Sequence, residues 1–219
     1  MTALVTKPIG QLHLAPGSLV TIPDVTWSEF EAILAERAHH SHGRIVYYQG
    51  TLEIMVPLPE HERPKELISD IVKALLKKQR IPYEPFGSTT FKQLGTAGVE
   101  PDACFYIQNA PQIIGLRRLQ PGDPPPDLAI ESDVTSKTTI DAYTAIGVPE
   151  VWIFDSGHLK IFVLQANSYV EKNQSIIFSS LPIVDIVNKT VERSWKIGSY
   201  QAFLEFEDTV LTTLNKPAD

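Results

Sequence analysis

The sequence contains one cysteine and no long apolar segment. Cys104 cannot form an internal disulfide, and its apolar neighbours in "ACFYI" predict a buried thiol in a reducing compartment. No apolar stretch approaches the roughly 20 residues that a membrane-spanning helix requires. The N-terminus also lacks a basic segment followed by an apolar one, as a secretory signal would show. These absences predict a soluble, cytoplasmic protein.

A general excess of positive charge is lacking as well. The 19 Lys and Arg residues are outnumbered by 26 Asp and Glu residues, which gives a net charge of −7. This balance argues against a protein whose whole surface binds nucleic acid, because phosphate binding depends on clustered bases. Between Arg63 and Lys92, however, seven bases stand against three acids. This segment forms either one basic binding face or the ordinary solvated face of a helix.

Internal repeats, low-complexity segments and helix-turn-helix motifs are also missing. His39, His40 and His42 form a cluster without the Cys or carboxylate spacing of a zinc site, so we interpret it as a loop. Hydrophobic content of 43% and charged content of 21% are ordinary for a globular protein. We predict an N-terminal arm over residues 1–22 and a single domain over residues 23–219.

The first half of the domain carries clear local signals. "TWSEFEAILAERA" begins with Thr26 and has Glu29 three residues later, which indicates a capping box and a short amphipathic helix. Alternating residues around Gln49-Gly50 predict a β-hairpin with strands at 44–49 and 52–56. The strongest helical pattern covers residues 60–79.

The second half alternates strands with a helix. Strand-like segments occupy residues 83–92, 99–107 and 127–134, and are followed by a helix at 136–146 that ends at Gly147 and by a strand that ends at Asp155. The order from residue 60 is therefore helix, strand, strand, strand, helix, strand. The strand-helix-strand unit over 127–155 predicts a parallel crossover within a mixed sheet, and hence an α/β (α+β) fold. Beyond it we expect another hairpin, a mixed region over 189–215 and a helix near 198–208.

Three carboxylates are expected to meet on this sheet. Asp102 follows Pro101 in one predicted strand, and Glu131 and Asp133 share a face of the next because strand side chains alternate. Grouped carboxylates repel one another unless a cation neutralises them, and Mg²⁺ or Mn²⁺ prefers such oxygen ligands. The alternative is that these acids face solvent. Glu100 shares the face of Asp102 and is a weaker site candidate.

Three segments resemble a known family: "GVEPDACFYI", "PDLAIESDVTSKT" and "YTAIGVPEVWIFD". They are similar to a Uma-type bacterial family of unknown function within the PD-(D/E)xK restriction-endonuclease-like superfamily, over about residues 24–185. The resemblance implies a restriction-endonuclease-like core, a mixed β-sheet flanked by helices, with an N-terminal β-hairpin and C-terminal additions. It also implies a Mg²⁺-dependent nuclease that acts on nucleic acid, with DNA as the expected substrate. Asp102 matches the PD acid and Glu131 the first acid of the second motif.

The sequence departs from the superfamily pattern at one position. The pattern has lysine two residues after the second acid, where this chain has Asp133. Lys137, at the start of the next predicted helix, is the nearest replacement, although a surface role is equally compatible with its position. Lys92 is a second candidate. His61, on the inward side of the 60–79 helix, is either a metal-water ligand and proton shuttle or a structural histidine.

Two other functions stay open at this point. One is a catalytically degenerate relative that binds nucleic acid or a protein partner, which the acidic net charge and Asp133 favour. The other is a structural or regulatory role as a homodimer, in which apolar segments such as "SIIFSSLPIVDIV" pack against a second copy.

Overall fold

Two β-sheets form the frame of the protein. The computed structural model describes residues 13–212 apart from 38–42, 88, 121 and 133–135. The five-stranded sheet has the order β1 (Leu19–Ile22), β3 (Thr51–Met55), β2 (Arg44–Tyr48), β6 (Ala97–Val99) and β5 (Phe91–Gln93). The six-stranded sheet has the order β11 (Ser168–Lys172), β10 (His158–Gln165), β9 (Glu150–Asp155), β8 (Leu128–Glu131), β7 (Ala103–Tyr106) and β4 (Glu84–Phe86).

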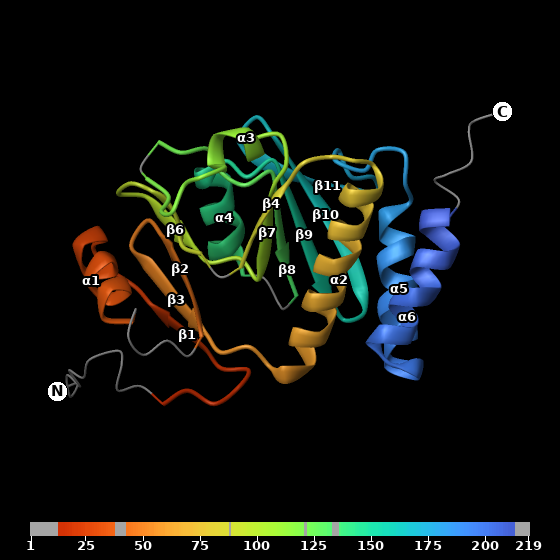
Figure 1. The fold of residues 1–219 in the computed structure, drawn as a ribbon. Helices are drawn as coiled ribbons and strands as arrows, with labels where there is room; N and C mark the ends of the chain where they lie inside the picture. The colour runs from red at the N-terminus through yellow and green to blue at the C-terminus, as the bar shows by residue number, and fades with distance from the viewer. Residues whose placement is uncertain (1–12, 38–42, 88, 121, 133–135, 213–219) are drawn as a thin grey trace.

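The helices lie in three layers around and between the sheets (Figure 1). They are α1 (Trp27–Arg37), α2 (Pro59–Lys78), α3 (Ala110–Ile113), α4 (Lys137–Ile146), α5 (Ile183–Ile197) and α6 (Ser199–Phe206), followed by a π-helical segment over Glu207–Leu211. Helix α1 covers the outer face of the five-stranded sheet, α4 lies between the two sheets, and α2, α5 and α6 cover the far face of the six-stranded sheet. The predicted α/β class with a mixed sheet is confirmed.

The predicted turns and caps are present. Thr26 and Glu29 form the capping box, since the Thr26 amide donates to Glu29 Oε2 at 2.7 Å and the Glu29 amide donates to Thr26 Oγ1 at 3.3 Å. Gln49 and Gly50 have φ angles of 44° and 88°, as the tight hairpin turn requires. Helix α4 begins after Ser136 and ends at Gly147, whose φ is 84°.

The six-stranded sheet separates two cores. On β8, Leu128 and Ile130 pack toward α2 and α5, whereas Ala129 packs toward α4. Strand β8 pairs in parallel with β9, and α4 connects the two, which confirms the predicted crossover unit. Because side chains alternate along a strand, Glu131 shares the α4 side with Ala129. The space between the two sheets is therefore where this acid lies.

Two predicted strands are each divided in the structure. The segment 99–107 divides at Pro101, because proline has no amide hydrogen for the ladder. Strand β6 ends at Val99 in one sheet and β7 begins at Ala103 in the other. Asp102 thus lies in the bend before β7 and not in the middle of a strand. The segment 83–92 likewise divides into β4 and β5, which belong to different sheets.

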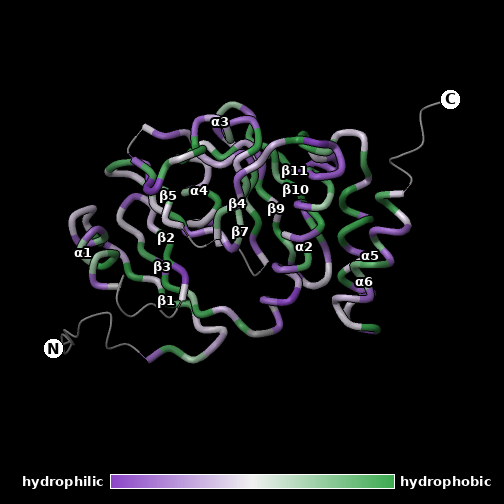
Figure 2. The backbone as a smooth tube through the Cα atoms, in the orientation of Figure 1, coloured by the Kyte–Doolittle hydropathy of each residue, from purple (hydrophilic) through white to green (hydrophobic). Residues whose placement is uncertain are grey.

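The C-terminal part differs from the mixed region that we predicted. A continuous helix, α5, occupies residues 183–197, and Gly198 separates it from α6. The signal was present, since buried residues recur at helical spacing along α5, and Figure 2 shows hydrophobic and hydrophilic residues alternating there. The segment "SIIFSSLPIVDIV" mainly packs into the chain's own core through Phe178, Leu181, Ile183, Ile186 and Val187. It therefore gives no support to a dimer.

The N-terminal arm also contributes to the fold. Residues 19–22, which we placed in the arm, form the edge strand β1 and pair with β3. Within the described residues, no helix is both long and apolar enough to cross a membrane.

Candidate metal and phosphodiester site

Asp102 and Glu131 are neighbours across the β7–β8 pair. Ala103 lies opposite Ile130 in this antiparallel register, so the next position sets Asp102 beside Glu131. Asp102 is held in place by Ser132, whose amide and hydroxyl both donate to Asp102 Oδ2, at 2.8 and 2.9 Å. The register thus sets these two acids side by side.

Glu131 ends β8 and is 4% exposed. The hydroxyl of Tyr143, from α4, donates to Glu131 Oε1 at 2.5 Å. Burial raises the pKa of the Glu131 carboxyl to about 7; the Arg44 guanidinium opposes this shift, and the charge of Asp102 adds to it. Without a cation nearby, this carboxylate would be costly to keep charged.

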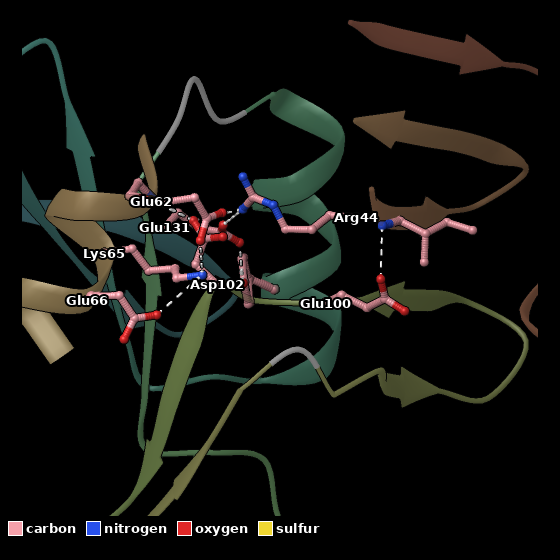
Figure 3. A network of polar contacts seen from close by, with 10 residues as sticks. Arg44, Glu62, Lys65, Glu66, Glu100, Asp102 and Glu131 are labelled. Atoms are coloured by element: carbon pink, nitrogen blue, oxygen red, sulfur yellow. Dashed lines mark hydrogen bonds and ion pairs between the residues drawn. The ribbon is translucent and has the colours of Figure 1, made fainter. Parts of the chain in front are cut away.

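That cation is Arg44, which comes from the other sheet. Its Nη1 lies 2.9 Å from Asp102 Oδ2 and 2.5 Å from Glu131 Oε2 (Figure 3). Arg44 is two residues before Val46, which packs in the core between the sheets, so both side chains take the inner face of β2. The sequence analysis missed Arg44, although strand alternation from the apolar Val46 places Arg44 on the inward face of β2.

Helix α2 brings a second cation to the same place. Lys65 Nζ donates to Glu62 Oε2 at 2.5 Å and lies 3.6 Å from Glu66 Oε1 (Figure 3). Burial lowers the pKa of the Lys65 ammonium, but the hydrogen bond and charge of Glu62, with the charges of Asp102 and Glu66, outweigh this and raise it. Lys65 therefore carries its charge at neutral pH. The sequence analysis counted Lys65 only as one base of a basic segment.

An open groove of about 680 Å³ gives access to these residues. Its charged lining consists of four bases and three acids: Arg44, Lys65, Lys92, Arg118, Glu62, Glu100 and Asp102. Glu131 is not in the lining and lies behind Asp102 and Arg44. A ligand in the groove would thus meet Asp102 before Glu131.

Glu100 lies in the groove but is used to connect backbone segments. Its carboxylate accepts a hydrogen bond from the Ile45 amide at 3.2 Å and another from the Thr90 hydroxyl at 2.8 Å. These bonds join β2 to the chain before β5. Glu100 therefore has a clear structural role, and it stays the weaker candidate for a site residue.

The other predicted residues are less closely tied to the groove. Lys137 is exposed at the first residue of α4 and is not in the groove lining. Lys92 is in the lining, where its Nζ contacts Glu31 of α1 at 3.0 and 3.1 Å. His61 lies in α2, but its side chain is outside the described part of the chain, as are Asp133 and the His39–His42 cluster.

The donor set fits a hard divalent cation in part. Two carboxylate oxygens converge on one cationic nitrogen, and oxygen ligands of this kind suit Mg²⁺ or Mn²⁺. No group of three His, Cys, Asp or Glu residues suited to a metal occurs within the residues that the structure describes, and Asp133 is not one of them. Binding would require the Arg44 guanidinium to move aside.

Among the solved structures similar to this chain is that of "a putative nuclease belonging to DUF820" from Anabaena variabilis. It has 17% sequence identity and a TM-score of 0.49, and the match covers 74% of this chain and 96% of that chain. None of the curated proteins matches the chain.

A family model matches most of the chain. The Uma2 family, described as "Putative restriction endonuclease", matches residues 22–188. This range contains β2, α2, β7 and β8, and so covers every residue of the site. The match confirms the resemblance that the three sequence motifs carry. The chain therefore belongs to the Uma2 family.

Proposed function

We propose that this protein hydrolyses phosphodiester bonds in nucleic acid, with DNA as the expected substrate, and that the reaction requires Mg²⁺ or Mn²⁺. The observation that carries the proposal is the convergence of Asp102 and Glu131 beside an open groove that also contains bases. The description of the family as restriction endonucleases supports it. Restriction-endonuclease-like families generally use divalent metal ions, which agrees with the paired carboxylates.

The chain's own residues have separable roles in this proposal. Asp102 and Glu131 would hold the ion, which when bound supplies a Lewis acid for the attacking water and the phosphate. Ser132 and Tyr143 fix the orientation of the two carboxylates through the hydrogen bonds described above. Asp133 is proposed as a third carboxylate ligand and His61 as a proton carrier. Lys137 is the sequence-based candidate for the cation beside the phosphate.

The alternative is a nuclease fold that binds nucleic acid or a protein without cleaving. One observation favours it: Arg44 already pairs with both Asp102 and Glu131, so part of their negative charge is offset without a metal ion. This protein would bind DNA with a strong salt dependence but would release no cleaved product with either metal.

A homodimer and a cytoplasmic location belong to the proposal as well. Trp195 and Tyr200 are 52% and 78% exposed on α5 and α6, where a second copy could cover them. Gel filtration of the purified chain checks the oligomeric state, and elution as a monomer at every concentration would remove the dimer.

Cleavage of labelled DNA and RNA in Mg²⁺ or Mn²⁺ tests the main proposal. Asp102→Asn and Glu131→Gln keep side-chain size and should each abolish cleavage, because an amide is a poor ligand for these ions. Glu192→Gln changes an exposed acid on α5 and serves as the matched control. Full activity in Asp102→Asn, or an inert wild type on both substrates, would overturn the nuclease assignment.

A further inference from the structure

The position that should hold lysine in this site holds Asp133, yet the structure brings another lysine to the carboxylates. We propose that Lys65 of α2 supplies the positive charge beside the scissile phosphate. This inference rests on the proposed nuclease function and names one further catalytic residue for it.

The position of Lys65 is the first argument. Its side chain is 17% exposed and lines the groove together with Asp102. Figure 3 shows the Lys65 ammonium beside Asp102. The side chains of Lys65 and Arg44 approach this acid from opposite sides. Leu67 and Ile68 follow on the same helix and are buried against the six-stranded sheet, so the helix that carries Lys65 is firmly packed. A firmly packed support is what an accurately placed catalytic group needs.

The charge of Lys65 is the second argument. Glu62 and Glu66 hold the ammonium in place, and the raised pKa of Lys65 keeps it protonated. A permanent cation stabilises developing charge but cannot act as a general base. As water attacks phosphorus, a new P–O bond forms and the bond to the leaving sugar oxygen breaks, and water supplies the proton that this oxygen takes up. Lys65 keeps its own proton throughout and offsets the extra negative charge on the phosphoryl oxygens.

The other bases near the site are less suitable. Arg44 is buried between the two carboxylates and is neutralised by them. Lys92 lines the groove from β5, where it contacts Glu31 of α1, and Lys137 is exposed and is not in the lining. Lys65 is the groove lysine whose charge interacts directly with that of Asp102.

The test measures single-turnover cleavage of a labelled DNA duplex at saturating enzyme with Mn²⁺. Lys65→Ala should slow the cleavage step by about 100-fold or more, the size seen when one charge-stabilising donor is removed. Lys65→Arg should restore part of the rate because the charge returns. Lys73→Ala is the matched control, since Lys73 lies on the same helix and forms the same i,i+3 ion pair, with Asp70, outside the groove.

Each outcome decides the matter. A Lys65→Ala rate within threefold of the wild type overturns the assignment while the nuclease function stands, and so does a large loss confined to Lys137→Ala. An inert wild type overturns the nuclease function and the role of Lys65 together. Thermal melting checks folding; if Lys65→Ala does not fold, Lys65→Met, which keeps the apolar stem, replaces it.

Discussion

Arg44 belongs to the five-stranded sheet, whereas the two acids that it contacts lie at the six-stranded sheet, Glu131 at the end of β8 and Asp102 just before β7. Its side chain is 8% exposed, and those of Asp102 and Glu131 are 4% and 5% exposed, so water screens this group of charges poorly. Arg44 therefore does two things at once. It offsets part of the negative charge of two carboxylates that would otherwise repel each other more strongly, and it joins the five-stranded sheet to the six-stranded one.

Replacing Arg44 with methionine should destabilise the metal-free protein strongly. Breaking a buried ion pair by removing one partner typically costs about 3 to 5 kcal/mol, because the remaining charge stays buried. Urea denaturation would measure this loss. Millimolar Mn²⁺ should then raise the melting temperature of the variant more than that of the wild type, since the ion no longer competes with the guanidinium.

Arg193→Met is the matched control for this substitution. Arg193 also pairs with a carboxylate, that of Glu205, but both side chains are exposed. The Arg193→Met variant should lose much less stability than Arg44→Met, and Mn²⁺ should not change its melting temperature relative to the wild type. Equal effects of the two substitutions would show that Arg44 is not the neutralising group of the site.

The residues of the site differ in how far the sequence could reveal them. Asp102 and Glu131 were predictable, because strand alternation and the pairing of adjacent strands place them together. Arg44, Lys65 and Tyr143 were not identified, because periodicity shows which face a side chain takes but not which layers stack face to face. The role of Asp133 and Lys137 remains a prediction.

At the scale of elements, helix α1 depends on a close approach to β6. A Cβ atom on Gly98 would lie 2.4 Å from Phe30 Cζ, well inside contact distance, and Phe30 is fully buried. Gly98→Ala should therefore destabilise the protein by about 1 to 3 kcal/mol, as overpacking of a core does. Urea denaturation checks the value. The double variant Gly98→Ala/Phe30→Leu should lose less stability than the sum of the losses in the two single variants, because the smaller side chain relieves the clash.

Gly87→Ala provides the control for Gly98→Ala. A Cβ atom on Gly87 would meet nothing within 4 Å. This variant should keep the stability of the wild type. Equal losses of stability in the two alanine variants would contradict the idea that Gly98 is required by the packing of Phe30.

The sequence predicted most elements but joined some strands that the structure separates. Capping residues and turn glycines correctly marked α1, α4 and the β2–β3 hairpin, because these signals are local. The segment 99–107 was taken as one strand, although Pro101 interrupts it and sends its halves to different sheets. Helix α5 was missed in part because its β-branched residues also suit strands.

At the scale of the whole molecule, one buried acid outside the site should set part of the pH dependence of stability. Glu150 is fully buried, and it accepts hydrogen bonds from Trp152 Nε1 and from the Ile176 amide, the latter at 2.7 Å. Burial raises its pKa above the ordinary value of 4.5, although these bonds oppose the shift. The folded protein thus holds this proton at pH values where the unfolded chain has lost it.

The sign of the effect follows from linkage. Because the folded state binds more protons, the contribution of Glu150 to the free energy of unfolding decreases as pH rises from 4.5 through the raised pKa. Glu150→Gln cannot ionise, so its stability relative to the wild type should increase as pH rises from 4.5 through the raised pKa of Glu150. Urea denaturation across this range measures it. A constant difference, like that expected for the exposed Glu192→Gln, would contradict the prediction.

The whole arrangement places the carboxylates of Asp102 and Glu131 between two sheets, beside a groove that Asp102 and Lys65 help to line. Calorimetric titration of Mn²⁺ into the wild type and into the Asp102→Asn/Glu131→Gln double variant tests this account most directly. We predict binding to the wild type that is lost in the variant. Identical titration curves for the two proteins, with or without binding heat, would contradict the assignment of Asp102 and Glu131 as the metal ligands.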